Sequence, residues 1–193
     1  MKILLTLFVL FFSSSVVADD ISDFEIEGMS VGDSLLDYFS ENEIVTQYET
    51  TKSHYNYLPK KYAEVYLFKN LENYDYMSFF YNLNDKKYII QSIRGIITFP
   101  KINECLNKQK ELSLFVKGMF PNANYFENEY DHPLDKSGRS KNYEITYESQ
   151  NNEFHIGIHC TDFEEDLRIK NNWDEGLSLS IKKIEVSNWL ADY

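Results

Sequence analysis

The two cysteines of the chain constrain its fold more than any other feature, because each lies on the apolar side of a predicted element. Over 102–119, apolar side chains recur at steps of three and four, the spacing that stacks side chains on one helix face. Cys105 belongs to that face, which is apolar except for Gln109. Residues 154–160 alternate apolar and polar side chains, as in a strand with one buried side, and Cys160 is on that side. Both thiols therefore point into the same core.

Residues 1–18 have the pattern of a secretory signal peptide. Lys2 precedes an apolar run of ten residues, 3–12, which is too short for a hydrocarbon core that needs about 20. Val16 and Ala18 are small residues placed for signal peptidase. We therefore predict cleavage after Ala18 and a soluble product that is periplasmic or secreted, with an uncleaved anchor as the alternative. No later segment is apolar enough to span a membrane.

An exported chain with two cysteines usually joins them in a disulfide, because its compartment is oxidising. A bridge from Cys105 to Cys160 closes a loop of 55 residues, for which the chain-entropy model gives on the order of 4 kcal/mol. Two buried free thiols are the alternative. Metal ligation and redox catalysis are disfavoured, since the chain has no Cys-x-x-Cys and an inward-facing cysteine is a poor nucleophile.

Removal of the signal leaves 175 residues, which suits a single domain over 19–193 with an ample core. Two packed halves, 19–100 and 101–193, are the alternative, because no linker of biased composition marks a boundary. The net charge of −12 becomes −13 once Lys2 is removed. A surface this negative repels the phosphate backbones of nucleic acids and the headgroups of anionic lipids, so we predict no nucleic-acid partner.

The chain predicts an α+β fold in which helices cover an antiparallel sheet, in the order helical opening, three strands, central helix, three strands. Capping-box patterns at Ser30 with Asp33 and at Ser40 with Glu43 mark two helix starts. Residues 122–141 are predicted as a mobile loop and 162–176 as an acidic loop. The predicted helices are 31–39, 41–47 and 102–118, and the predicted strands are 62–68, 76–83, 88–99, 143–148, 154–160 and 177–186, the last with a bulge near Lys182 or Lys183.

Two stretches carry a resemblance to known proteins. IEGMSVGDSLLDYFS at 26–40, followed by tyrosine-rich strands, YIIQSIRGIITF at 88–99 and a cysteine-bearing helix, resembles small exported proteins of marine alphaproteobacteria. The resemblance implies a periplasmic protein without an assigned activity, and it supplies no functional residues. In element order the chain is also similar to BamE-type outer-membrane lipoproteins, although it lacks their lipidated cysteine and is longer. A tandem of helix-plus-sheet units looks like the beta-lactamase inhibitor proteins in outline only.

No metal or other cofactor is predicted. His155 and His159 lie on one strand face, but residues four apart on a strand are about 13 Å apart, whereas ligands approach one ion to about 2 Å. They are therefore interpreted as two separate surface histidines. The acidic loop lacks the spacing of a calcium loop, so solvated carboxylates are favoured over calcium ligands. Its acidic residues are Asp162, Glu164, Glu165, Asp166, Asp174 and Glu175.

No catalytic residue is predicted, because no nucleophile elbow, phosphate loop or metalloprotease motif occurs. Tyrosines can stack on sugars or peptides, although many tyrosines also follow from strand propensity or from an AT-rich coding sequence. We expect a non-enzymatic binding module for an unknown protein or small ligand. A small envelope hydrolase that uses carboxylates and one of His54, His132, His155 or His159 is the alternative. The predicted ligand surface consists of His54, Tyr55, Tyr57, Tyr66 and Tyr143.

Overall fold

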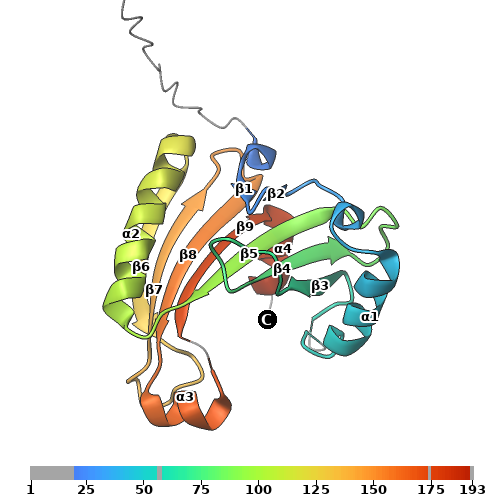
Figure 1. The fold of residues 1–193 in the computed structure, drawn as a ribbon. Helices are drawn as coiled ribbons and strands as arrows, with labels where there is room; N and C mark the ends of the chain where they lie inside the picture. The colour runs from blue at the N-terminus through green and yellow to red at the C-terminus, as the bar shows by residue number, and fades with distance from the viewer. Residues whose placement is uncertain (1–19, 56–57, 174, 192–193) are drawn as a thin grey trace, which may run out of the picture.

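The computed structural model describes residues 20–55, 58–173 and 175–191. Seven strands form one antiparallel sheet in the order β3-β4-β5-β9-β8-β7-β6 (Figure 1), so the predicted α+β class is confirmed. The predicted signal peptide with its cleavage after Ala18, and Tyr57 of the predicted ligand surface, lie outside the described residues. The strands are β3 Tyr62–Leu67, β4 Tyr76–Asn82, β5 Ile90–Thr98, β6 Asn124–Asp131, β7 Lys141–Glu148, β8 Phe154–Asp162 and β9 Gly176–Lys183, with a separate small pair of β1 Glu25–Ile26 and β2 Met29–Ser30.

The sheet runs without a break through both halves of the chain, because β5 and β9 pair at its centre with Ile93 opposite Ile181. A helix precedes the strands of each half, α1 before β3 and α2 before β6. The predicted capping box of Ser40 and Glu43 does begin α1. The helices are α1 Glu41–Thr51, α2 Ile102–Met119, α3 Glu165–Asn171 and α4 Ile184–Ala191, with short 3-10 turns η1 Ile21–Asp23 and η2 Leu35–Asp37.

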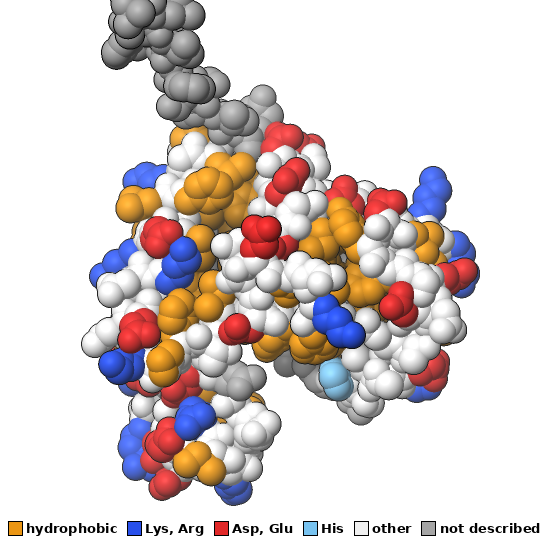
Figure 2. All heavy atoms as spheres, in the orientation of Figure 1, with side chains coloured by type: hydrophobic (Ala, Val, Ile, Leu, Met, Phe, Trp, Pro, Cys, Tyr) orange, Lys and Arg blue, Asp and Glu red, His pale blue; other side chains and the backbone are white. Residues whose placement is uncertain are grey.

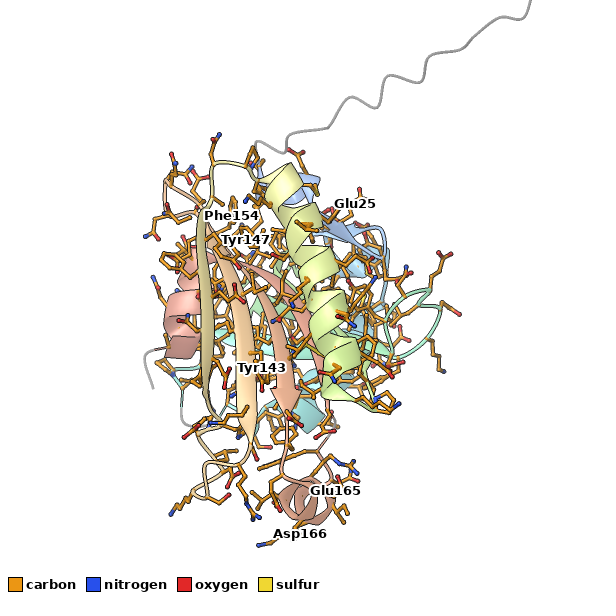
Figure 3. All side chains as sticks on the ribbon, turned by 90° about the vertical axis from the view of Figure 1, so that its left-hand side faces the viewer. Glu25, Tyr143, Tyr147, Phe154, Glu165 and Asp166 are labelled. Carbon is orange, nitrogen blue, oxygen red and sulfur yellow. A yellow bond between two sulfur atoms is a disulfide. The ribbon has the colours of Figure 1, made fainter. Side chains whose placement is uncertain are left out.

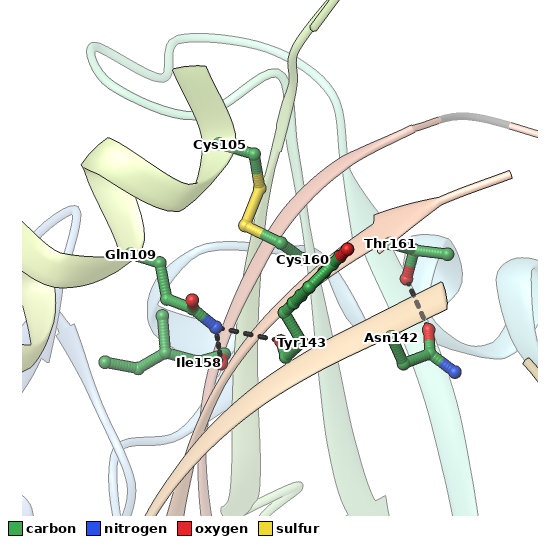
Figure 4. Close-up of a disulfide and its surroundings, with 7 residues drawn as sticks. All are labelled: Cys105, Gln109, Asn142, Tyr143, Ile158, Cys160 and Thr161. Carbon is green, nitrogen blue, oxygen red and sulfur yellow. Dashed lines mark hydrogen bonds between the residues drawn. A yellow bond between two sulfur atoms is a disulfide. The ribbon is translucent and has the colours of Figure 1, made fainter. Parts of the chain in front are cut away.

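Helix α2 lies along one face of the sheet, where it contacts β7, β8 and β9 (Figure 3). The predicted disulfide is confirmed: it joins Cys105 of α2 to Cys160 of β8, with 6.0 Å between their Cα atoms (Figure 4). Gln109, the polar residue on this helix face, is buried, and its amide donates to the backbone carbonyls of Tyr143 and Ile158, both at 2.8 Å. A carbonyl has two lone pairs, so the amide bonds to the strands without breaking their ladder.

The predicted helix over 31–39 is wrong except for the single turn η2. Gly32 has a φ of +106°, which a helix does not allow. Its backbone N–H donates to the carbonyl of Ile90 at 2.9 Å, and the N–H of Leu35 donates to that of Tyr88 at 3.0 Å. The backbone of this segment therefore bonds to the start of β5 and is not free to form local helical bonds.

Strand β6 was not predicted, and residues 122–141 are not one loop. All eight residues of β6 are exposed, so the alternation that marks a half-buried strand is absent. The remainder of the segment turns around Asp135, whose buried carboxylate accepts hydrogen bonds from the backbone N–H groups of Ser137 and Ser140 at 2.8 Å. The side chains of Ser137 and Ser140, together with these backbone bonds, hold the pKa of Asp135 well below its usual range.

The acidic segment 162–176 contains helix α3, which also was not predicted. Its carboxylates make protein contacts: Glu164 caps the helix and lies 3.2 Å from Arg139, and Glu165 accepts two hydrogen bonds from Arg168 at 2.9 Å. Figure 3 shows Glu165 and Asp166 on α3, at the end of the molecule away from β1.

The predicted bulge near Lys182 is wrong, because β9 ends at Lys183 and α4 begins at the next residue. Val186 and Trp189 are three residues apart, a helical spacing, and both are buried. They pack against the other face of the sheet in a second small core with Leu58, Tyr62 and Phe80. Helix α4 is only eight residues long, so it covers one end of this face.

On the outer side of α2, hydrophobic side chains reach the surface near one end of the helix (Figure 2). The exposed ones on this helix are Leu114 and Phe115. Phe115 contacts Phe24 with 6.1 Å between ring centroids. Its exposed ring therefore lies where α2 packs against the N-terminal segment.

Candidate ligand-binding face

The sheet face opposite α2, which we call the polar face, is built from strand residues that alternate with those of the main core. It carries charged side chains, histidines and serines where the α2 face carries apolar ones. Its described members include Glu64 and Tyr66 on β3, Tyr76, Ser78 and Phe80 on β4, Ser92, Arg94 and Ile96 on β5, Ser178, Ser180 and Lys182 on β9, His155, Gly157 and His159 on β8, and Glu144, Thr146 and Glu148 on β7.

The middle of the polar face is hollow because small residues meet there. Arg94 lies opposite Ser180, Ser180 lies opposite Gly157, and Ser92 lies opposite Lys182. A hollow of about 330 Å³ opens above them, and it also contacts Tyr55, Phe80, His159, Ser178 and Leu190. A second hollow of about 160 Å³ shares Arg94, His159 and Ser178 with the first and continues toward Tyr76 and Glu175.

Arg94 is held by a buried carboxylate. Its Nη2 donates to Glu64 at 3.2 Å, and its Nε donates to the hydroxyl of Ser78 at 3.2 Å. Glu64 has no exposed side-chain area and also accepts hydrogen bonds from the hydroxyls of Tyr55 at 3.1 Å and Tyr66 at 2.6 Å. Burial first, and then the charge of Glu64, raises the pKa of Tyr66. Since a guanidinium has five N–H donors, Arg94 is fixed in place and still has donors for the hollow.

Lys182, in contrast to Arg94, is not held by a carboxylate of the described residues. Within the described residues its ammonium has no hydrogen bond and no ion pair. Burial, followed by the charge of Arg94, lowers the pKa of Lys182 to about 8, although the charge of Glu144 acts in the other direction. At pH 7 most molecules therefore carry a protonated, partly buried Lys182 beside the positive Arg94, and no carboxylate of the described residues lies within ion-pair distance of it. Such an ammonium is costly unless an anion approaches it.

The two histidines of β8 lie on the polar face and are more enclosed than surface residues, with 15% of the His155 side chain and 30% of the His159 side chain exposed. His159 Nε2 lies 3.3 Å from Glu144, and His155 Nδ1 lies 3.8 Å from Glu148. Burial, followed by the charge of Lys182, lowers the pKa of each histidine to about 4. Both rings are therefore neutral at pH 7, although each has a carboxylate nearby.

Gly157 makes room for the ring of His159. A Cβ atom at position 157 would lie 2.7 Å from His159 Nε2 and 3.2 Å from Ser180 Oγ. The first of these contacts is shorter than real Cβ atoms make, so the ring of His159 would have to shift. The glycine therefore lets the imidazole lie along β8 beside the hollow.

Three aromatic rings form a shelf at the β3–β4 end of the polar face. The ring centroids of Tyr66 and Phe68 are 6.0 Å apart, and those of Phe68 and Tyr76 are 5.6 Å apart, both pairs stacked. Phe68 is 66% exposed. Because Tyr66 also bonds to Glu64, the shelf is connected to Arg94 and lies next to the hollow.

The structure brings together only part of the predicted ligand surface. Tyr55 and Tyr66 meet at Glu64, and His54 is exposed in the turn after α1. Tyr143 does not join them, because it pairs with Cys160 on the α2 face (Figure 4). Tyr147, which shares that face, is buried and its hydroxyl donates to the carbonyl of Ser113 at 2.8 Å.

His132 lies in an aromatic cluster with Phe163 and Trp173, at 4.8 and 5.6 Å between ring centroids. Burial lowers its pKa. Arg94, Lys182 and Glu64 were not predicted as site residues. The sequence pattern that could have pointed to them is the alternation of polar and apolar residues, since Arg94 and Lys182 lie at the polar positions of strands whose other side is apolar.

Over the described ranges, no group of three or more histidine, cysteine or acidic residues is arranged to hold a metal ion. No helix in the described part of the chain is long and apolar enough to cross a membrane. Comparison with known proteins finds no matching family model, no matching curated protein and no matching solved structure.

Proposed function

We propose that the protein is a non-enzymatic binding module whose polar face takes up an anionic group of its ligand. The observation that carries this proposal is the unpaired ammonium of Lys182 in the floor of the hollow. Arg94 adds a second positive charge, and the hydroxyls of Ser92 and Ser180 add hydrogen-bonding groups. A small number of fixed polar groups in a concave site is the usual design of a ligand pocket.

The ligand we propose is a small molecule that carries a carboxylate, phosphate or sulfate beside an apolar or ring-shaped portion. The anion lies between Lys182 and Arg94, and the remainder lies toward Tyr76 and the aromatic shelf. Aromatic faces stack on planar groups and on sugar rings. The chain as a whole is strongly acidic, with a net charge of −12. The positive charges of Arg94 and Lys182 therefore make the hollow a local exception on an acidic protein.

We also propose that the protein acts in the periplasm or outside the cell. The signal-peptide pattern of residues 1–18 and the disulfide between Cys105 and Cys160 support this location, because such bridges persist in oxidising compartments.

A hydrolase remains the second candidate, and the pair of His159 and Glu144 at 3.3 Å favours it. Two observations favour binding over hydrolysis. A general base works best with a pKa near the operating pH, whereas burial lowers the pKa of His159 to about 4. In addition, no hydroxyl in the described chain donates a hydrogen bond to His155 or His159, as an activated serine would.

The experiment is a thermal-unfolding screen of the purified protein with small carboxylates, phosphates and sulfated sugars. An anion at tenfold its dissociation constant stabilises the fold by about 1.4 kcal/mol, which raises Tm by roughly 3 °C. We expect that rise in the wild type and in Lys183→Met, because Lys183 lies on the other side of β9, and its loss in Lys182→Met. A rise that persists in Lys182→Met contradicts the proposed site. Turnover of an ester, peptide or glycoside that stops in His159→Gln supports the hydrolase.

A further inference from the structure

The two edge strands of the sheet, β3 and β6, differ in whether other parts of the chain bond to their outward backbone groups. On β3, helix α1 satisfies the outward backbone groups: Gln47 accepts from the N–H of Tyr66 at 2.7 Å and donates to its carbonyl at 3.1 Å. Thr51 donates to the carbonyl of Glu64 at 2.9 Å. A strand cannot add at this edge without displacing those side chains. In the described part of the chain, no element covers the other edge, β6, whose residues are all exposed.

The register identifies which groups of β6 are open. In an antiparallel pair, residues that bond to the neighbouring strand alternate with residues that point away from it. Just beyond β6, the N–H of His132 donates to the carbonyl of Ser140 at 2.9 Å, so residues of even number bond toward β7. The odd residues direct their N–H and carbonyl groups outward, and these groups have no partner in the described chain. They are Tyr125, Glu127, Glu129 and Asp131.

The side chains of the same four residues make this edge acidic. Lys141 pairs with Asp131, and the hydroxyl of Tyr125 donates to Glu127 at 2.6 Å. Glu129 has neither a hydrogen bond nor an ion pair within the described residues. A hollow of about 220 Å³ between α2 and this strand, lined by Leu106, Lys110, Glu127 and Glu129, leaves room for long side chains on this side.

We infer that β6 is a docking edge for an extended segment of another protein, one that carries lysine or arginine at alternate positions. The segment adds as an eighth strand: its backbone bonds to the outward groups of β6, and its basic side chains lie over Glu127 and Glu129. A second copy of the chain is a poor occupant, because pairing β6 with itself brings like charges together across the strands. This surface is independent of the hollow on the polar face.

The test uses the full chain with the disulfide formed and a blocked peptide of the length of β6 that alternates lysine with threonine and valine. Binding is measured by calorimetry, and amide hydrogen exchange is measured by NMR. We expect protection of the odd-numbered amides from 125 to 131 on binding, and binding roughly tenfold weaker for the peptide with glutamate in place of lysine.

Two variants make the test specific. Glu129→Pro removes an outward N–H without touching the ladder to β7, which edge strands tolerate, and should weaken binding roughly tenfold or more. Glu129→Gln keeps the N–H and should weaken it about two- to threefold. The inference is overturned if the peptide does not bind, if it binds without protecting the odd amides, if Glu129→Pro binds as the wild type does while its Tm is unchanged, or if the free protein pairs with itself through β6.

Discussion

Acid should destabilise this protein well above the pH at which its carboxylates protonate, and the cause should be the two histidines of the polar face. Burial and Lys182 lower the pKa of His155 and His159 to about 4, against about 6.5 in the unfolded chain. The unfolded chain therefore binds more protons between these values. The stabilisation by the neutral rings is complete above pH 6.5 and is lost progressively as the pH falls to 4.

The size of the effect follows from those two values. For a single group with a pKa of about 4 when folded and about 6.5 when unfolded, linkage gives a loss of about 2 kcal/mol between pH 7 and pH 5. The two histidines together lose about 4 kcal/mol as an upper bound, because protonation of one ring affects the other. That is a large part of the stability of a typical domain, which is about 5–15 kcal/mol.

The assay is urea unfolding of the wild type and of a His155→Gln/His159→Gln variant at several values between pH 7 and pH 5. We expect the midpoint of the wild type to fall across this range and that of the variant to change much less. His54→Gln is the matched control, because His54 is exposed. If the double variant loses stability as steeply as the wild type, the assignment of the acid sensitivity to these histidines is wrong.

Three further predictions concern stability. Reduction of the Cys105–Cys160 bridge should lower the free energy of unfolding in urea by about 4 kcal/mol. An unfolding midpoint that reductant does not change would show that the bridge does not stabilise the fold. Gly157→Ala should lower the free energy of unfolding by about 1–3 kcal/mol, because the new Cβ meets His159. Gly118→Ala in α2, where nothing lies within 4 Å of the new Cβ, should raise it by about 0.5–1 kcal/mol. Equal effects at both positions would contradict the packing argument. Glu64→Gln should cost about 2–3 kcal/mol, since Arg94 and two tyrosine hydroxyls lose a charged acceptor, while Glu104→Gln on the surface of α2 should change the midpoint little.

The elements with a clear apolar period were predictable from the sequence. In the central helix 102–118 and in the strands that became β4, β5 and β8, the periodic apolar residues pack into the main core, so their period reports the structure. The disulfide was predictable for the same reason, since both cysteines belong to such faces.

The errors occurred where long-range contacts decide the structure. Residues around Gly32 bond to β5, which no local pattern reveals. Strand β6 buries no side chain and is held by its pairing with β7. The change of phase after Ile181 has two explanations, a bulge or a helix, and the choice depends on whether Val186 and Trp189 find a surface to cover.

The candidate site shows the same limit. Arg94 and Lys182 come from strands that are far apart in the chain and adjacent in the sheet, so their proximity depends on the central β5–β9 pairing. The predicted ligand surface includes both Tyr66 and Tyr143, which lie on opposite faces of the sheet. Alternation alone does not say which side of a strand faces outward when both faces of the sheet carry aromatic residues.

The most direct test of the anion site is an NMR titration of the free protein with inorganic sulfate and with citrate, in which the Cε–H signals of Lys182 and the Nε–H signal of Arg94 are followed. We expect both signals to move together and to saturate with at least one of these anions, and we expect the signals of Lys183 to stay unchanged. If Lys182 and Arg94 stay unchanged with both anions, or if Lys183 moves as much as Lys182, the hollow of the polar face is not an anion-binding site.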